Sequence, residues 1–379
     1  MAIITDRVNT DKVTDIAKAK REEHCIQDLT LFNGVRHVMR PAQRLENVRR
    51  RALQFREMVL SGGEANFLKT EDLVYAPYPT KFAYLHAVKS WVPYILLSNK
   101  MFIVQFNVGG SINSARTTKN LLFGINDPIG NGETPYFKSM RERGGWIAKN
   151  FVEPRLEKAA KQINQQLAIN GLSPKDIDYI SFDHLHVQDL RKWLGSDGST
   201  GFFPNAKLLV MRQEWESTQG LLPIQQPWYC PDGAKGIDAN KIILLDSSAM
   251  LGHGVALLQT PGHTEGNQSL VVHIDGQLFV ASENGMSADS YAPLFSRIPG
   301  LQNYALKNNV EVILNGNTLE NSIDQYISMV MEKTIAGPHL DYDGFCNFIP
   351  SSEHAPMWFS RSVNPTVQVS NLNYGMLMK

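Results

Sequence analysis

Three histidines in two short segments could bind a metal ion. His184 and His186 directly follow a predicted strand, Ile177–Phe182, and are separated by one residue. Side chains two residues apart on an extended backbone point to the same side. Because neutral imidazole is a common zinc ligand, both rings could bind one ion. A pair with this spacing also occurs as ordinary surface or core histidines, so the pair alone leaves both interpretations open.

The third histidine, His263, lies in a short loop, residues 260–267 (TPGHTEGN), between two predicted strands. One proline and two glycines favour a tight loop, and loops at strand ends often carry functional side chains. We therefore expect His263 to serve as a metal ligand rather than to pack in the core. His253 stands in the turn Leu251–Gly254 before a strand, and we expect it to be a turn residue.

Predicted strands form two groups, with helices before, between and after them. A helix is expected over Arg40–Ser61 and another over Ser322–Thr334, because apolar residues recur there at helical spacing. Residues 81–88 and 94–106 are rich in aromatic and β-branched residues, and we expect them to form a hairpin. Its turn is expected at Ser98–Lys100. The other predicted strands are Lys119–Ile125, Ile177–Phe182, Ala206–Met211, Lys241–Asp246, Val255–Thr260, Ser269–Ile274, Gln277–Ala281 and Glu311–Leu314. This order indicates two sheets packed together with helices outside.

The loop at 260–267 resembles the TPGHTxGH loop of the metallo-β-lactamase superfamily, and His184-Leu185-His186 resembles the start of its HxHxDH motif. The resemblance implies an α/β protein with an αββα sandwich, the metallo-β-lactamase fold. It places this catalytic domain at residues 79–336, between a helical N-terminal extension (1–78) and an irregular C-terminal tail (337–379).

Four positions depart from the family pattern. Gln188 stands where HxHxDH has its aspartate, and Asp189 where it has its last histidine. Glu283 replaces the usual aspartate, and Asn317 replaces the usual final histidine. By this resemblance Asp189, Glu283 and Asn317 remain candidate ligands of a second metal, but their carboxylate and amide oxygens suit harder ions or no ion.

The resemblance leaves the first metal site intact as His184, His186 and His263. We expect one firmly bound ion there, zinc first and iron or manganese as alternatives, and a second ion that is weak or absent. Three imidazoles leave zinc an open position for water, whose pKa falls towards ~7. Asp189 or Glu283 would then act as the catalytic base or orient the water. Asp183 either fixes an imidazole tautomer or is an ordinary loop carboxylate.

These features predict a metal-dependent hydrolase that uses metal-bound hydroxide on a small electrophile: an ester, lactone, amide or activated carbon–halogen bond. Aromatic residues in two loops, around Trp228 and Tyr342, suggest an aromatic or apolar substrate, although loop packing explains them equally well. Two alternatives stay open. One is an iron-dependent oxidoreductase on the same fold, and the other is a pseudo-enzyme that acts as a binding protein.

Composition excludes several other classes. Lys plus Arg and Asp plus Glu both number 37, which argues against a basic nucleic-acid-binding coat. The chain has three widely spaced cysteines, which form no disulfide framework or zinc knuckle, and no apolar stretch of membrane-spanning length. We expect a cytoplasmic protein that binds neither membrane nor nucleic acid, and that forms a homodimer through its N-terminal helices and tail.

Overall fold

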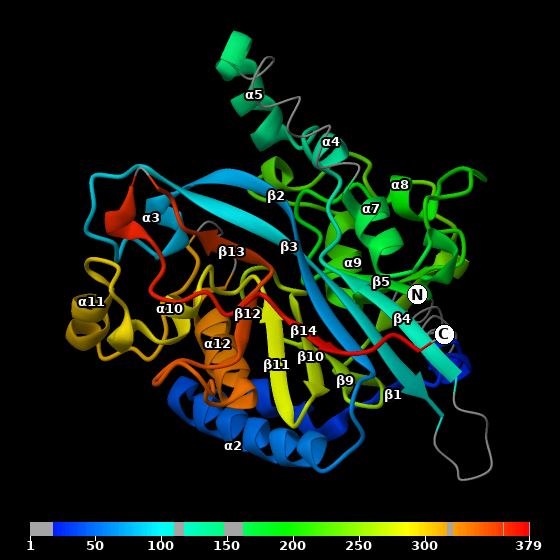
Figure 1. Cartoon of the computed structure of the whole chain (residues 1–379), viewed down its shortest axis with the longest axis horizontal. Coiled ribbons are helices and arrows are strands. Elements are labelled where there is room, and N and C mark those ends of the chain that lie inside the picture. Colours follow the sequence, from blue (N-terminus) through cyan, green and yellow to red (C-terminus); the bar gives the residue numbers. More distant parts are fainter. Residues whose placement is uncertain (1–17, 110–116, 148–161, 317–320, 359, 379) are drawn as a thin grey trace, which may run out of the picture.

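Two β-sheets lie face to face, and helices cover their outer faces, in a computed structural model of the chain (Figure 1). The structure describes residues 18–109, 117–147, 162–316, 321–358 and 360–378. One sheet has six strands in the order β1-β8-β9-β10-β11-β12. The other has eight: seven follow the order β14-β2-β3-β4-β5-β6-β7, and β13 pairs with β3.

The strands of the six-stranded sheet are β1 (Gln27–Asp28), β8 (Ala249–Gly252), β9 (Val255–Gln259), β10 (Gln268–Ile274), β11 (Gln277–Ser282) and β12 (Phe348–Pro350). Those of the eight-stranded sheet are β2 (Phe67–Pro79), β3 (Tyr94–Val108), β4 (Thr117–Phe123), β5 (Tyr179–Ser181), β6 (Lys207–Met211), β7 (Ile242–Leu245), β13 (Ser352–Ala355) and β14 (Asn373–Gly375).

The helices are α2 (Pro41–Leu60), α3 (Thr80–Ala83), α4 (Pro128–Asn131), α5 (Pro135–Ile147), α7 (Gln162–Ile169), α8 (Arg191–Leu194), α9 (Arg212–Gln219), α10 (Ala288–Tyr291), α11 (Leu301–Asn308) and α12 (Ser322–Ala336). Short 3-10 turns occupy Thr30–Phe32, Val35–His37, Pro174–Asp176, Gln226–Trp228, Ala239–Lys241, Pro293–Phe295 and Arg361–Val363.

Side-chain alternation along the strands creates three apolar layers. On β3, Phe102 and Val104 pack between the two sheets, while Ile103 packs under α7 and α8. On β9, Leu257 faces the space between the sheets and Leu258 faces α2 and α12. Successive residues of a strand point to opposite faces, so each central strand is buried on both sides.

Helix α2 confirms the amphipathic helix expected over Arg40–Ser61. Its buried residues recur every three or four positions and pack with α12 and the six-stranded sheet. They are Val48, Ala52, Phe55 and Val59. Figure 1 shows α2 and α12 together on the outer side of this sheet. The helix is therefore part of a core layer of the sandwich.

The αββα fold class is confirmed, and so is the hairpin of β10 and β11 around Asp275-Gly276, where both turn residues have positive φ. The predicted hairpin turn at Ser98–Lys100 is wrong, because these residues lie inside β3. Ser98 donates to Asp72 of β2, and Asn99 donates to Ser352 of β13. Partners on both neighbouring strands keep this polar run in the sheet.

Four other segments differ from their predicted secondary structure. The strand expected over 81–88 is absent, since α3 ends at Ala83 and a turn follows it. Residues 67–79 form strand β2 rather than part of a helical extension, since β2 pairs along its whole length with β3. The tail expected to be irregular contributes β12, β13 and β14 to the two sheets. Glu311–Leu314 is not a strand, although Val312 and Leu314 are buried. The division of the chain at residues 78 and 336 remains a prediction.

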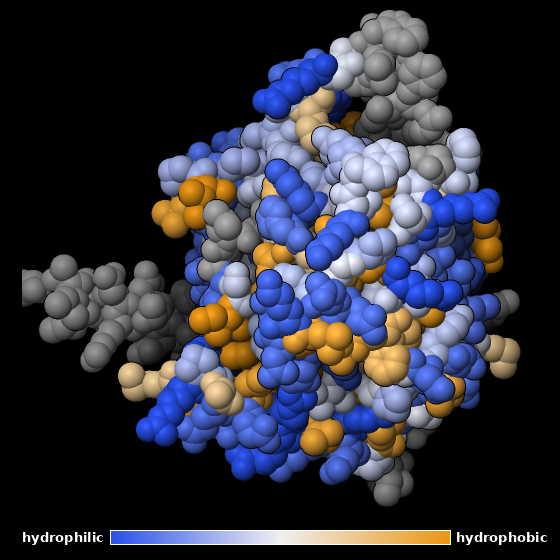
Figure 2. Space-filling view, turned by 90° about the vertical axis from the view of Figure 1, so that its left-hand side faces the viewer, coloured by the Kyte–Doolittle hydropathy of each residue, from blue (hydrophilic) through white to orange (hydrophobic). Residues whose placement is uncertain are grey.

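The surface is mixed in character. Figure 2 shows that, on the face turned to the viewer, hydrophobic side chains lie in small groups between hydrophilic ones. Such scattered apolar residues are normal on a protein surface. In the part of the chain that the structure describes, no helix has the length and apolar character needed to cross a bilayer.

Candidate metal centre

The three predicted histidines come together at the junction of the two sheets. His184 and His186 follow β5 of the eight-stranded sheet, and His263 lies in the loop between β9 and β10 of the six-stranded sheet. Gln268, the first residue of β10, ties these regions together. Its backbone N–H donates to the Asp183 carbonyl at 2.8 Å, and its side-chain amide donates to the Phe182 carbonyl at 2.7 Å.

The three imidazole rings are close enough to share one ion. The ring centroid of His184 lies 4.7 Å from that of His186 and 4.4 Å from that of His263, and the His186 and His263 centroids lie 5.2 Å apart. One ring nitrogen from each residue lies within 4.8 Å of the others. All three side chains are buried. The predicted convergence of the three rings is therefore present in the structure.

Two glycines allow the His263 loop to pack tightly between two helices. A Cβ on Gly262 would lie 2.3 Å from Cα of Gln325 on α12. A Cβ on Gly266 would lie 2.1 Å from the backbone nitrogen of Glu214 on α9. Because real side chains do not approach backbone atoms so closely, only glycine fits at these two positions. The loop is thus held from both sides, and His263 is held with it.

A carboxylate orients His184. Asp183 Oδ1 accepts the His184 backbone N–H at 2.9 Å and lies 3.0 Å from its ring Nδ1. Burial alone would lower the pKa of His184, but the adjacent Asp183 carboxylate raises it to about 9. With Nδ1 facing this carboxylate, Nε2 is left as the metal-binding nitrogen. The geometry thus favours the tautomer-fixing role considered for Asp183.

His186 and His263 have the opposite electrostatic character. Burial, followed by the positive charge of His184, holds the pKa of His186 well below its usual value, and the same two causes act on His263. Both rings are therefore neutral, as metal binding requires. The Nε2 atom of His186 is buried and has no hydrogen-bond partner among the described residues. A buried nitrogen of this kind fits a metal ligand, since leaving it unpaired is otherwise costly.

Glu283 is brought to the cluster, as predicted. It follows β11, and its Oε1 lies 3.9 Å from Nε2 of His263. A carboxylate oxygen of Glu283 also groups with Asp183 and His184 within 4.8 Å. Ser352 donates to Glu283 Oε2 at 2.8 Å. Burial raises the pKa of Glu283 to about 7, and the His184 charge opposes this rise. A carboxylate that titrates near neutrality can accept or donate a proton.

Other residues of the expected second site are not assembled in this way. Asp189 forms a two-pronged ion pair with Arg191, whose Nε and Nη2 donate to the two carboxylate oxygens at 2.8 and 2.7 Å. The backbone turns into the left-handed region at Val187 (φ 59°), an uncommon conformation for a β-branched residue. Gln188 keeps a buried Oε1 without a hydrogen-bond partner in the described structure. Asn317 lies outside the described residues.

Several polar residues near the histidines were not predicted from the sequence. Asn315 places its amide 3.2 Å from Nδ1 of His263, and Tyr78 donates to Asn315 Oδ1 at 3.1 Å. Asn284 Oδ1 accepts the His263 backbone N–H at 3.0 Å. Glu214 contacts both histidine loops. These residues come from α9, β2 and the segments after β11 and α11, so no local motif identifies them.

Aromatic rings form part of the surroundings of His186. The Tyr229 ring centroid lies 4.8 Å from the His186 ring, and the Trp228 centroid lies 6.4 Å from it. Tyr136 of α5 packs on Trp228 with centroids 4.5 Å apart. Of the two aromatic clusters in the sequence, this one therefore lies beside the candidate metal centre.

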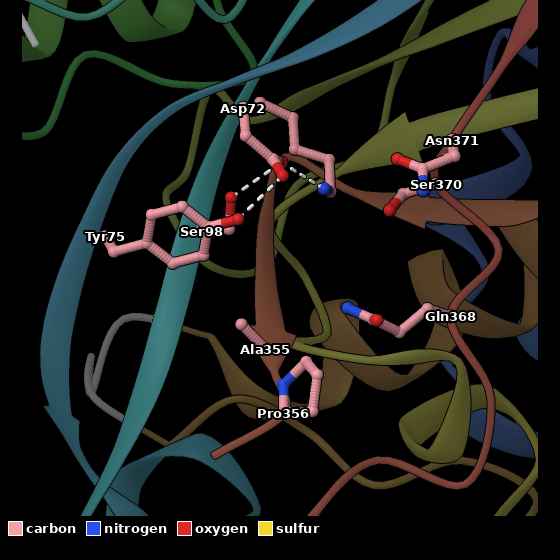
Figure 3. A pocket seen from close by; sticks show the side chains of 9 residues that line it. Asp72, Tyr75, Ser98, Ala355, Pro356, Gln368, Ser370 and Asn371 are labelled. Atoms are coloured by element: carbon pink, nitrogen blue, oxygen red, sulfur yellow. Dashed lines mark hydrogen bonds and ion pairs between the residues drawn. The ribbon is translucent and has the colours of Figure 1, made fainter. Parts of the chain in front are cut away.

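A separate polar cavity of about 260 Å³ lies between β2, β3 and the C-terminal segment. Figure 3 shows Asp72 at one wall, where its carboxylate accepts from Ser98, Tyr75 and Lys100. The ammonium group of Lys100 is also 3.2 Å from Glu353. None of the three histidines lines this cavity, so it is distinct from the metal centre.

Comparisons with known proteins give partial matches. No protein-family model matches the chain. A curated N-acyl homoserine lactonase from Bacillus sp. is 30% identical over 131 residues, which cover 35% of this chain and 46% of the relative. The lactonase AttM from Rhizobium radiobacter is 30% identical over 131 residues, or 32% of this chain and 45% of the relative. The chain thus spans about half the length of the curated relatives it matches.

Among solved structures, a probable metal-dependent hydrolase from Staphylococcus aureus is 15% identical. That alignment covers 84% of this chain and 99% of the other, with a TM-score of 0.49. The layered sandwich, the meeting of His184, His186 and His263, and the curated sequence relatives agree with the resemblance predicted from the motifs. The chain is a metallo-β-lactamase-fold protein.

Proposed function

We propose that this protein is a metal-dependent hydrolase that opens a lactone, a cyclic ester. The observation that carries the proposal is the buried trio of His184, His186 and His263, whose ring nitrogens lie within 4.8 Å of one another. The names of the curated relatives, N-acyl homoserine lactonases, favour a lactone over the other electrophiles considered. An amide and a linear ester remain outcomes that the assay below distinguishes.

The three histidines would hold one zinc ion, which supplies Lewis acidity and lowers the pKa of bound water towards ~7. Asp183 holds the ring of His184 in the tautomer that presents Nε2 to the ion. Glu283, at the edge of the cluster, would accept the proton of the attacking water and return it to the alkoxide that leaves on ring opening.

We further propose that one ion is bound firmly and that a second is weak or absent. A second ion would have to use Glu283 and oxygens near Gln188 and Asp189. Both carboxylate oxygens of Asp189 already accept from Arg191. Breaking that pair would oppose binding of the second ion. At the first site, Asp183 holds His184 through Nδ1 and leaves Nε2 for the ion.

A test begins with the metal content of the purified protein and its ability to open an N-acyl homoserine lactone, followed as acid release. The matching open-chain methyl ester and amide are run beside it. We expect about one zinc per chain and faster hydrolysis of the lactone. H186A and H263A should lose both the metal and the activity. H253A is the matched control, because His253 lies in the turn between β8 and β9, outside the histidine cluster.

Two outcomes would overturn the proposal. One is a wild-type protein that binds no metal after growth and dialysis with zinc. The other is a metal-loaded protein that opens no lactone. The homodimer stays a prediction of its own, and a mass in solution of only 42.5 kDa would contradict it.

A further inference from the structure

We propose that Glu214 is a positioning residue that locks the two metal-binding loops to each other. This inference rests on the proposed function, since it concerns the same three histidines. Glu214 lies in the first turn of α9 and is 1% exposed. It is not a metal ligand in the proposed site. Its role would be to set the distance between the loop of His184 and His186 and the loop of His263.

Its two carboxylate oxygens contact the two loops separately. Oε1 accepts the backbone N–H of Leu185 at 2.7 Å, and Leu185 stands between His184 and His186. Oε2 accepts the hydroxyl of Thr264 at 2.7 Å, and Thr264 follows His263 directly. One rigid carboxylate thus bridges segments that lie 79 positions apart in the chain (185 and 264).

The burial of this carboxylate indicates that the contacts are strong. A buried charge destabilises the fold by several kcal/mol unless hydrogen bonds compensate. Glu214 has a third donor besides the two loops, the hydroxyl of Tyr229 at 3.2 Å from Oε1. Bonds from N–H and O–H groups to a carboxylate are shorter and stronger than bonds between neutral groups. These three bonds of the carboxylate all go to segments beside the histidines.

The close approach of Gly266 to the start of α9 is an independent observation. The nearest atoms to a Cβ built on Gly266 are the backbone nitrogen, Cα and Cβ of Glu214, at 2.1, 2.4 and 2.5 Å. The loop that carries His263 therefore rests on Glu214 by backbone contact as well as by the hydrogen bond of Thr264. Both features fix the position of this loop relative to the same residue.

A metal site makes this precision necessary. Three ligand atoms must be held to within about 0.5 Å of the required geometry, and groups that orient ligands usually contribute 10- to 100-fold in metal affinity. Here the ligands come from two different sheets, so the relative position of the loops is not set by either sheet alone. Glu214 supplies a direct link between them.

The experiment compares zinc dissociation constants, measured by competition with a chromogenic chelator, for full-length variants. E214L removes both acceptors, and T264V removes one hydroxyl with almost no change in shape. We expect zinc binding to weaken about 10- to 100-fold in E214L and more mildly in T264V. E214Q still accepts the Leu185 N–H and T264S keeps the hydroxyl, so both should stay closer to the wild type. E216Q removes an exposed carboxylate from the same helix and is the charge-matched control.

Thermal melting of the metal-free proteins separates positioning from folding. T264V, the milder variant, is expected to melt close to the wild type and still lose zinc affinity. Equal zinc affinity of folded T264V, E214L and wild type would overturn the inference and leave the proposed function standing. A wild-type protein that binds no zinc would overturn both. If E216Q bound zinc as weakly as E214L, the inference would also be overturned. The change in net charge, rather than the lost contacts of Glu214, would then explain the lower zinc affinity.

Discussion

The carboxylate of Asp183 lies 3.0 Å from Nδ1 of His184, and its other oxygen accepts the hydroxyl of Ser351. Ser351 belongs to the C-terminal part of the chain, between β12 and β13. Its neighbour Ser352 donates to Glu283. Two successive serines of this segment thus hold the two acidic residues closest to the histidines. The C-terminal segment is therefore part of the candidate site.

The first prediction concerns Asp183. In D183N the amide accepts less strongly from the His184 ring, so Nε2 becomes a weaker ligand and the ring is oriented less firmly. Zinc affinity should fall about 10- to 100-fold by chelator competition. In the metal-free protein the pKa of His184 should drop from about 9 towards or below its ordinary value, which NMR titration can follow. Asp232 is exposed, so D232N serves as the control. An unchanged zinc affinity in D183N would show that the contact is only structural.

Asp189 gives a contrasting prediction. The family pattern makes Asp189 a candidate ligand or base, whereas the structure pairs it with Arg191. D189N should therefore keep the zinc affinity and stoichiometry of the wild type. Its stability should fall by no more than about 1 kcal/mol, because the Arg191 side chain is 36% exposed and solvent weakens the pair. Loss of bound zinc in D189N, measured by elemental analysis, would restore the ligand role for this residue.

The sequence was informative where function is carried by a short local pattern. His184, His186 and His263 are each marked by neighbours that fix a strand end or a tight loop, and their convergence was predicted correctly. Glu283 was found through the family resemblance, in which a strand at this place ends in an acidic ligand. These residues need only local backbone geometry and the order of the strands, which periodicity and turn residues reveal.

Other features depend on contacts that no local pattern encodes. From the sequence, Glu214 is an ordinary polar residue at the start of a helix. It is buried between the two histidine loops because the loop of Gly266 packs directly against it. The polar run at Ser98–Lys100 reads as a turn until the partners on β2 and β13 are known. The pairing of Asp189 with Arg191 likewise cannot be foreseen from the motif, and the ligand role of Asp189 stays a prediction.

Glu332 of α12 provides a stability prediction. It is buried, and its carboxylate accepts from Ser269, Ser282, Asn284 and Tyr291 at 2.6 to 2.8 Å. In E332A these four donors lose their acceptor inside the core. We expect a loss of at least about 3 kcal/mol in unfolding free energy by urea denaturation. E57A, an exposed glutamate on α2, should change stability by less than about 0.5 kcal/mol. A loss below 1 kcal/mol in E332A would mean that water replaces the carboxylate.

The last prediction concerns His354 and pH. This ring on β13 is buried, with Nδ1 2.6 Å from the hydroxyl of Tyr84, and burial lowers its pKa to about 3. The unfolded chain has an ordinary histidine pKa near 6.5, so between pH 6.5 and 3 the unfolded state binds one more proton than the folded state. The contribution of His354 to the free energy of unfolding is therefore fully present above pH 6.5, and it decreases as the pH falls below that value.

The test compares wild type with H354N, in which the side chain is polar but does not titrate. Between pH 6.5 and 5.5 the wild type should lose about 1 kcal/mol more unfolding free energy than H354N. The other histidines contribute equally to both proteins and cancel in the difference. Parallel curves for the two proteins over this range would mean that His354 keeps an ordinary pKa in the folded state, which requires that water or an acidic group reaches its ring.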